Sequence, residues 1–67
     1  MPKFKNMRQR VEFAYDELNV DIFYEGDYMY TILDHSCEEF IEMLTEEELD
    51  RELSRIWMHM HCESALN

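Results

Sequence analysis

The segment SCEEFIEMLTEEELDRELSRIWMHMHC, residues 36–62, decides the expected fold because its apolar residues have the clearest helical spacing in the chain. In its first half, four apolar side chains recur at i, i+3, i+4 and i+7: Cys37, Phe40, Ile41 and Leu44. Ser36 and Glu39 form an S-x-x-E capping box at the start of this pattern. We therefore expect an amphipathic helix that begins at Ser36 and carries glutamates on its polar face.

The second half of the segment restarts the helical pattern after Thr45. Thr45 and Glu48 form another capping box. A second apolar stripe follows, consisting of Leu49, Leu53, Ile56 and Met60, with Trp57 beside it. Because Leu44 and Leu49 are five residues apart, the two stripes do not continue one helical face. The sequence therefore predicts two helices with a break at Thr45.

Before this segment, residues 19–33 predict a β-hairpin. Apolar residues alternate along both arms: Val20, Ile22 and Tyr24 on the first, and Tyr28, Tyr30 and Ile32 on the second. The loop Glu25-Gly26-Asp27 holds the only glycine of the chain, and a three-residue hairpin loop favours glycine at its positive-φ position. Pairing Tyr24 with Tyr28 places both apolar sets on one face. The other face carries a partly apolar set that a second subunit could cover: Asp21, Phe23, Met29, Thr31 and Leu33.

Residues 10–18 fit two patterns. The first is the alternation typical of a half-buried strand, in which Val11, Phe13 and Tyr15 alternate with Glu12, Ala14 and Asp16. A helical face is also present, formed by Met7, Val11, Ala14, Tyr15 and Leu18, with Asn6 and Gln9 as a cap. Such a helix would place its bases at the start and its acids at the end, against the helix dipole. We therefore favour a strand.

The predicted fold is α+β: a small antiparallel β-meander of two or three strands, followed by two amphipathic acidic helices. Sixty-seven residues suffice for a single domain, which we expect to span residues 1–67 with a basic, frayed arm over residues 1–7. Two cysteines, Cys37 and Cys62, are too few for a disulfide framework. The sequence shows no signal-peptide pattern and no apolar run of membrane length, so we expect a reducing, cytoplasmic setting.

The distribution of charge is the strongest functional indication. Sixteen acidic and six basic residues give a net charge of −10. Residues 11–50 contain fourteen Asp and Glu and no Lys or Arg. Like charges at i, i+3 or i+4 on a helix destabilise it by about 0.2–0.5 kcal/mol per pair. Because the fold tolerates so many of them without interleaved lysines, we infer that the negative field is itself functional.

Histidines and cysteines offer one weak metal-binding pattern. His35 and Cys37 are two residues apart, and His59 and Cys62 are three apart on one predicted helical face. Together they supply the ligand types of a Cys2His2 zinc site, but the spacing matches no standard zinc finger, so we expect no metal and no other cofactor. Catalysis by Cys37 with a histidine base would need an enclosed pocket that so short a chain is poorly able to build. We expect that the protein is not an enzyme.

The acids instead favour a protein partner. Direct binding to nucleic acid is disfavoured because carboxylates repel phosphates. A rigid array of carboxylates at helical spacing approximates the charge density of DNA, which is one charge per about 1.7 Å of duplex. We therefore predict a small acidic inhibitor that mimics nucleic acid and blocks the basic site of a nucleic-acid-processing protein. The acids expected to bind this partner are Glu38, Glu39, Glu42, Glu46, Glu47, Glu48, Asp50, Glu52, Asp21, Glu25, Asp27 and Asp34.

In size and charge, the chain resembles the small acidic proteins that phages use against restriction enzymes, CRISPR effectors, nucleases or host polymerase. The resemblance implies an anti-defence or polymerase-antagonist role in the host cytoplasm, with a basic nucleic-acid-binding protein as partner and no role at a membrane. It is carried by size and charge and by no motif.

The alternative is a homodimeric structural, adaptor or antitoxin-like module whose charge serves solubility. Such a dimer would bury the second face of the sheet and an apolar edge of the last helix. The residues expected at this self-association surface are Trp57, Met58, Met60 and Phe23.

Overall fold

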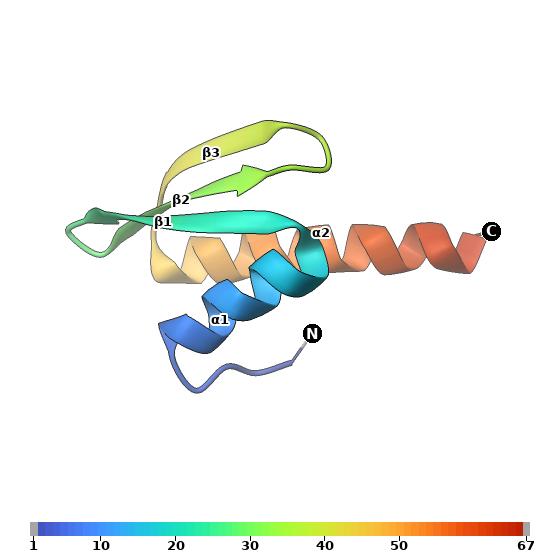
Figure 1. Cartoon of the computed structure of the whole chain (residues 1–67), viewed down its shortest axis with the longest axis horizontal. Helices are drawn as coiled ribbons and strands as arrows, with labels where there is room; N and C mark the ends of the chain where they lie inside the picture. Colours follow the sequence, from blue (N-terminus) through green and yellow to red (C-terminus); the bar gives the residue numbers. More distant parts are fainter. Residues whose placement is uncertain (1, 67) are drawn as a thin grey trace.

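The computed structural model describes the backbone of residues 2–66 and the side chains of residues 2–61. In chain order, the elements are α1 (Met7–Phe13), the π-helical turn η1 (Ala14–Leu18), β1 (Val20–Gly26), β2 (Met29–Asp34), β3 (Glu39–Leu44) and α2 (Glu46–Leu66). The strands form one antiparallel meander in the order β1-β2-β3, and the helices lie on one side of it (Figure 1). The predicted α+β class and meander are confirmed, but one helix precedes the sheet and one follows it.

The strand predicted for residues 10–18 is wrong, because this segment is helical. The helix begins at the cap that the alternative pattern indicated, where the Gln9 amide donates to the Asn6 side chain at 3.0 Å. The unfavourable dipole, worth about 0.3–1 kcal/mol per charge, is offset because both arginines of α1 have acidic partners. Arg8 pairs within α1, and Arg10 pairs with α2.

The last turn of this helix widens into η1. The Asn19 amide donates to the Ala14 carbonyl oxygen five residues earlier, and Asn19 then ends the helix in a left-handed conformation with a φ of 58°. Ala14 and Leu18 are buried in the core, whereas Tyr15 between them is 63% exposed. The helical pattern placed Tyr15 on the buried face, which is wrong.

The β1–β2 hairpin is confirmed, with a register two residues away from the predicted one. Tyr24 pairs with Tyr30 and not with Tyr28. The turn contains two residues, Asp27 and Tyr28, with φ of 52° and 61°, the positive signs of a type I′ turn. Gly26 has a φ of 89° at a bulge in β1 just before this turn. Because side chains alternate with a period of two, a two-residue shift keeps the predicted apolar face.

The first of the two predicted acidic helices is wrong, because its residues form β3 at the edge of the sheet. Between the pairs Ile32–Ile41 and Tyr30–Leu44, β3 has one residue more than β2, which is a β-bulge. Met43 in this bulge has a left-handed φ of 58°. The extra residue turns Ile41 and Leu44 to the same face of the strand, so their i, i+3 spacing imitates a helical turn.

Ser36 therefore begins no helix. It lies in the turn between β2 and β3, where its amide donates to the Asp34 carboxylate at 3.0 Å in an Asx-turn. Glu38 in the same turn has a left-handed φ of 56°, which interrupts any helix. The S-x-x-E pattern of Ser36 and Glu39 is accidental here.

α2 begins at the predicted capping box. The Glu48 amide donates to Thr45 Oγ1 at 3.2 Å, and the Thr45 amide donates to Glu48 Oε1 at 3.0 Å. The predicted apolar stripe is buried at Leu49, Leu53 and Ile56. None of the helices in the described part of the chain has the length and apolar character needed to cross a lipid bilayer.

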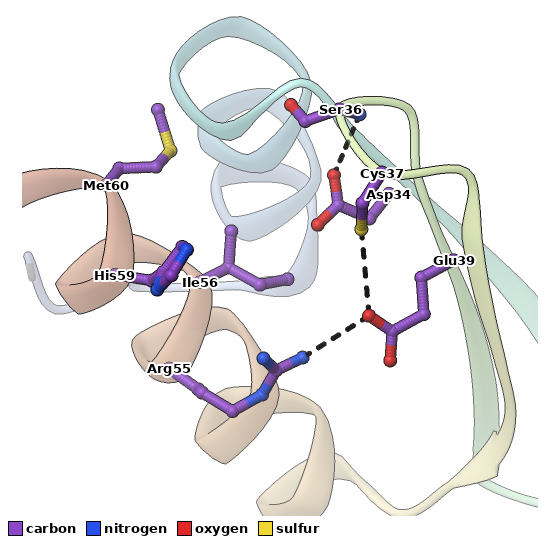
Figure 2. Close-up of a pocket in the computed structure, with 8 residues that line it drawn as sticks. All are labelled: Asp34, Ser36, Cys37, Glu39, Arg55, Ile56, His59 and Met60. Carbon is purple, nitrogen blue, oxygen red and sulfur yellow. Dashed lines mark hydrogen bonds and ion pairs between the residues drawn. The ribbon is translucent and has the colours of Figure 1, made fainter. Parts of the chain in front are cut away.

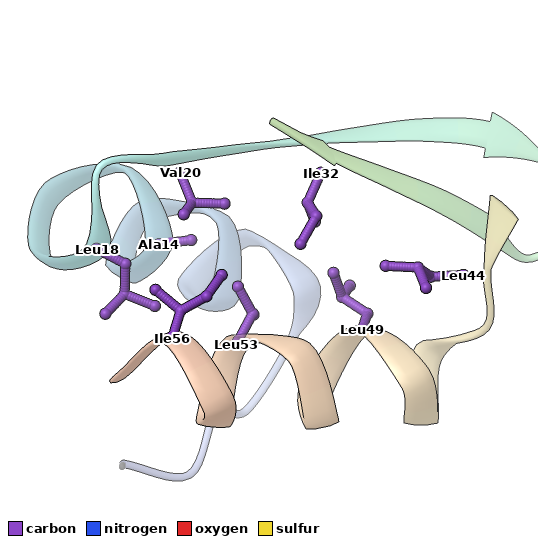
Figure 3. Packing of buried hydrophobic residues seen from close by; sticks show 8 residues of the cluster. All are labelled: Ala14, Leu18, Val20, Ile32, Leu44, Leu49, Leu53 and Ile56. Carbon is purple, nitrogen blue, oxygen red and sulfur yellow. The ribbon is translucent and has the colours of Figure 1, made fainter. Parts of the chain in front are cut away.

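The hydrophobic core lies between the sheet and the helices (Figure 3). Its buried members are Ala14, Leu18, Val20, Ile32, Leu44, Leu49, Leu53 and Ile56. The strand residues among them define the inner face of the sheet. The alternate strand residues form an outer face, which points away from α1 and α2 (Figure 1).

Candidate functional site

The acids predicted to bind a partner are spread over the sheet and one helix. Glu38, Glu39 and Glu42 lie in the β2–β3 turn and on β3, so the predicted array of carboxylates along two successive helices is wrong. α2 carries Glu46, Glu47, Glu48, Asp50 and Glu52. The other four are placed by β1, β2 and the turn between them: Asp21, Glu25, Asp27 and Asp34.

Half of these acids gather at one end of the molecule. Tyr24, Tyr30 and Leu44 form one row across the three strands, so the β1–β2 turn lies beside the end of β3, from which α2 starts (Figure 1). We call this region the acidic end, and its acids are Glu25, Asp27, Glu42, Glu46, Glu47 and Glu48.

Arg10 forms ion pairs with two acids of α2, whose charges it partly offsets, and it fixes α1 against that helix. Its Nε lies 2.6 Å from Asp50 Oδ1, and its Nη2 donates to Oδ2 at 3.1 Å. Its Nη1 lies 3.4 Å from Glu46 Oε1. Nε and Oδ1 are buried and meet as an ion pair without the alignment of a hydrogen bond. The Phe4 ring, from the segment predicted as a frayed arm, lies 5.7 Å from the guanidinium and 5.3 Å from the Phe13 ring.

Arg55 engages two further acids. Its Nε lies 2.8 Å from Glu52 Oε2, and its Nη2 lies 3.9 Å from Glu39 Oε2. The hydrogen bond to Glu52 raises the pKa of Arg55 above its usual value. Glu39 and Glu52 therefore help to join β3 to α2, and their charges are partly offset.

Three more of the predicted acids have local hydrogen-bond partners. Glu48 caps α2, and the hydrogen bond from the Thr45 amide lowers the pKa of its carboxyl group below the usual range. Asp34 accepts the amide of the β2–β3 turn. Asp21 Oδ2 lies 2.6 Å from His35 Nε2.

The carboxylates of five of the twelve predicted acids form neither an ion pair nor a hydrogen bond with any residue that the structure describes: Glu25, Asp27, Glu38, Glu42 and Glu47. All five are exposed, and all but Glu38 lie at the acidic end. Asp16 and Glu17 of η1, which are not among the predicted partner-binding acids, are likewise exposed and without an ion pair among the described residues. The acidic end therefore carries the largest group of unneutralised charges among the predicted acids.

A cavity of about 450 Å³ lies between the β2–β3 turn and α2 (Figure 2). Its lining residues are Asp34, Ser36, Cys37, Glu39, Arg55, Ile56, His59 and Met60. The Cys37 thiol donates to Glu39 Oε2 at 3.6 Å. Loss of water around the sulfur and the neighbouring Asp34 carboxylate raise the pKa of this thiol. A raised pKa is the opposite of what an activated nucleophile needs, so the cavity does not favour catalysis by Cys37.

The four residues of the weak zinc pattern are only partly brought together. Cys37 and His59 line the cavity, whereas His35 contacts Asp21 on β1. The side chain of Cys62 lies outside the described residues. Within the described part of the chain, no three His, Cys, Asp or Glu side chains are grouped closely enough to hold a metal ion.

The residues predicted to self-associate do not share one surface. Trp57 packs half-buried against the core, with its ring 4.2 Å from that of His61. Met58 and Met60 are exposed on the later part of α2. Phe23 lies on the outer face of the sheet and is 44% exposed. The sheet therefore separates Phe23 from Trp57.

The exposed apolar residues of β3 were not expected from the sequence. Phe40 was assigned to a buried helical stripe, yet it is 54% exposed on the outer face, and Met43 in the bulge is 56% exposed. The Asx-turn signal of Asp34 two residues before Ser36 could have indicated a turn at this point. No protein-family model, no curated protein and no solved structure matches this chain.

Proposed function

We propose that this protein is a small acidic inhibitor that occupies the basic, nucleic-acid-binding site of another protein. The observation that supports the proposal is the group of exposed carboxylates at the acidic end that the fold does not neutralise: Glu25, Asp27, Glu42 and Glu47. The partner is a protein and not nucleic acid, because phosphate would be repelled by the same charges.

The arginine contacts of the fold involve other acids, and this contrast makes the four unpaired carboxylates informative. Arg10 and Arg55 each contact two acids where α2 packs on α1 and on β3. Two like charges repel by about 1 kcal/mol at 4 Å in water, and by less at longer range or in salt. The unpaired carboxylates at the acidic end therefore add repulsion to a small fold, and a basic partner would relieve it on binding.

A basic groove that binds nucleic acid is a suitable partner because it concentrates lysine and arginine along a phosphate path. Carboxylates held on strands and on the first turn of a helix offer that groove fixed negative charges. Such complementarity accelerates association and makes it sensitive to ionic strength. We accordingly propose competition with nucleic acid, in the manner of a phage anti-defence protein or polymerase antagonist.

Charge reversal at the acidic end tests this proposal. A Glu42→Lys/Glu47→Lys variant should lose a partner that the wild-type protein captures from nuclease-treated bacterial lysate and that added DNA or RNA displaces. An Asp16→Lys/Glu17→Lys variant is the matched control, because it changes net charge equally at exposed, unpaired positions on η1. Equal binding by both variants, or a partner that ignores both salt and nucleic acid, would contradict the proposal.

The second candidate function, a homodimeric adaptor, is favoured by one observation. The outer face of the sheet exposes Phe23, Phe40 and Met43. A dimer through this face would appear in sedimentation equilibrium at micromolar concentration, and Phe40→Ser would dissociate it. Charge would then serve solubility.

A further inference from the structure

The outer face of the sheet has an apolar centre. In the strand register, Leu33 on β2 lies between Asp21 on β1 and Phe40 on β3. In the next row, Phe23 pairs with Thr31, and the β3 bulge that contains Met43 lies on the other side of Thr31. Rings and aliphatic side chains on neighbouring strands of one face are close enough to form a continuous surface.

The size of this centre limits what it can bind alone. Phe23, Phe40 and Met43 are 44%, 54% and 56% exposed, and Leu33 is half-buried. A fully exposed aromatic side chain offers about 150–250 Å², so these residues together expose an apolar patch on the order of 300 Å². A stable protein interface buries about 800 Å² on each partner. Most of the contact must therefore come from the polar residues around the patch.

Those surrounding residues are acidic. Glu25, Glu38 and Glu42 each lie two residues along the chain from Phe23 or Phe40, and all three are exposed and without an ion pair among the described residues. Asp21 lies on the same face and contacts His35. A partner that covers the patch consequently meets carboxylates at its margin. A second copy of this chain fits this face less well than a basic partner does, because it would bring a second net charge of −10 and an identical acidic margin.

We propose that the outer face docks into a groove that binds single-stranded nucleic acid. Such grooves combine basic side chains, which follow the phosphates, with aromatic side chains, on which bases stack. The outer face complements both kinds of side chain: the rings of Phe23 and Phe40 can contact the aromatic side chains of the groove, and the neighbouring glutamates can contact its basic side chains. Duplex-binding sites rely mainly on phosphate contacts and base edges, and give the exposed rings no comparable partner.

This inference rests on the proposed function, and it adds which surface binds and which class of basic site receives it. Two synthetic peptides of equal charge serve as probes: one alternates Arg and Trp, and the other alternates Arg and Ser. We would titrate each into the ¹⁵N-labelled protein at physiological salt and follow the amide signals. The Arg–Trp peptide should bind at least about tenfold tighter and perturb Phe23, Leu33, Phe40 and Met43.

Two variants locate the binding surface. Phe40→Ser should reduce the affinity for the Arg–Trp peptide to that for the Arg–Ser peptide, because it removes an exposed ring without opening the core. Tyr15→Ser is the matched control, since Tyr15 is an exposed ring on η1 that is 63% exposed, and it should leave the affinity unchanged.

The outcomes separate the two proposals. If both peptides bind equally and Phe40→Ser has no effect, the acidic surface binds basic groups but the docking face proposed here is wrong. The docking face is also wrong if the signals that move belong to Trp57 and the later part of α2, or if the face proves to be buried in a dimer. If neither peptide binds, the protein has no affinity for basic groups, and the proposed function fails together with the inference.

Discussion

Arg10 and Asp50, forty residues apart in the chain, meet side-on: Nε lies 2.6 Å from Oδ1 and Nη2 lies 3.1 Å from Oδ2. The guanidinium side chain is 10% exposed, whereas that of Asp50 is 44% exposed. This contact joins the N-terminal and C-terminal parts of the fold, because it fixes α1 against α2.

Replacing this arginine should destabilise the protein. Removal of one partner of a buried ion pair costs about 3–5 kcal/mol, but Asp50 and Glu46 can regain water, so we expect a loss of about 1–3 kcal/mol for Arg10→Met. Arg8→Met, which removes an exposed i, i+4 pair, should cost less than about 0.5 kcal/mol. Urea unfolding measures both, and equal stability of the two variants would show that the contact contributes little.

The capping box of α2 predicts a pH-dependent contribution to stability. Thr45→Ala should lower the free energy of unfolding by about 1 kcal/mol, because it leaves a helix amide without its acceptor. The folded-state pKa of Glu48 is lowered, so the contribution of its charge is present above the unfolded value and is lost as the pH falls through the folded value.

Glu48→Gln should therefore be less stable than the wild-type protein near neutral pH, and the difference should shrink as the pH falls below 4.5, the ordinary glutamate value. Urea unfolding at several pH values between about 3 and 7 measures it. A difference that stays constant across this range would mean that the Glu48 charge is not the cause. Glu47→Gln is the control, because this neighbour makes no capping hydrogen bond.

The bulge in β3 predicts opposite effects for two substitutions of Met43. A left-handed φ costs a non-glycine residue about 1–2 kcal/mol, while glycine loses about 0.5–1 kcal/mol of extra chain entropy on folding. Met43→Gly should therefore stabilise the fold by up to about 1 kcal/mol, and Met43→Val should destabilise it, because a β-branched residue tolerates this conformation least. Glu42→Gly, at a position without a positive φ, should only destabilise. If Met43→Gly and Glu42→Gly lose equal stability, Met43 carries no strain.

The thiol in the cavity should react slowly. Because desolvation and Asp34 raise the pKa of Cys37, less thiolate is present at neutral pH than in an unfolded peptide. In a Cys62→Ser background, which leaves one thiol, alkylation by iodoacetamide should reach half of its maximal rate at a higher pH than in the urea-unfolded chain. A folded-state profile that lies at the same or a lower pH would contradict this expectation.

The parts of the fold that the sequence predicted are those determined by near neighbours. The hairpin of β1 and β2 follows from alternation and from a single glycine, and the start of α2 follows from a reciprocal pair of hydrogen bonds between Thr45 and Glu48. The register of the hairpin could not be predicted from the local pattern. The bulge at Gly26 shortens the turn but leaves every side chain on its predicted face, so the apolar alternation is the same in both registers.

The errors have two physical causes. The helix over residues 7–18 looked unfavourable because its bases precede its acids, against the helix dipole, and the acid that pairs with Arg10 lies forty residues away. β3 looked helical because its bulge places Ile41 and Leu44, three residues apart, on the same face of the strand. A spacing of three residues between apolar side chains on one face is also what an amphipathic helix shows. For the candidate site, the negative net charge could be predicted from the composition. The carboxylates that pair with Arg10 and Arg55 could not, because these pairs depend on tertiary contacts.

The bulge has a further consequence for the behaviour of the protein at high concentration. β3 is an edge strand, and a long, regular edge beside an exposed apolar face would recruit the strands of other molecules into a growing sheet. Here the irregular backbone at Met43 and the adjacent charge of Glu42 interrupt the row of amide and carbonyl groups that such growth requires. The same feature that makes the segment resemble a helix in sequence thus disfavours the addition of further strands at β3, while the apolar face stays open.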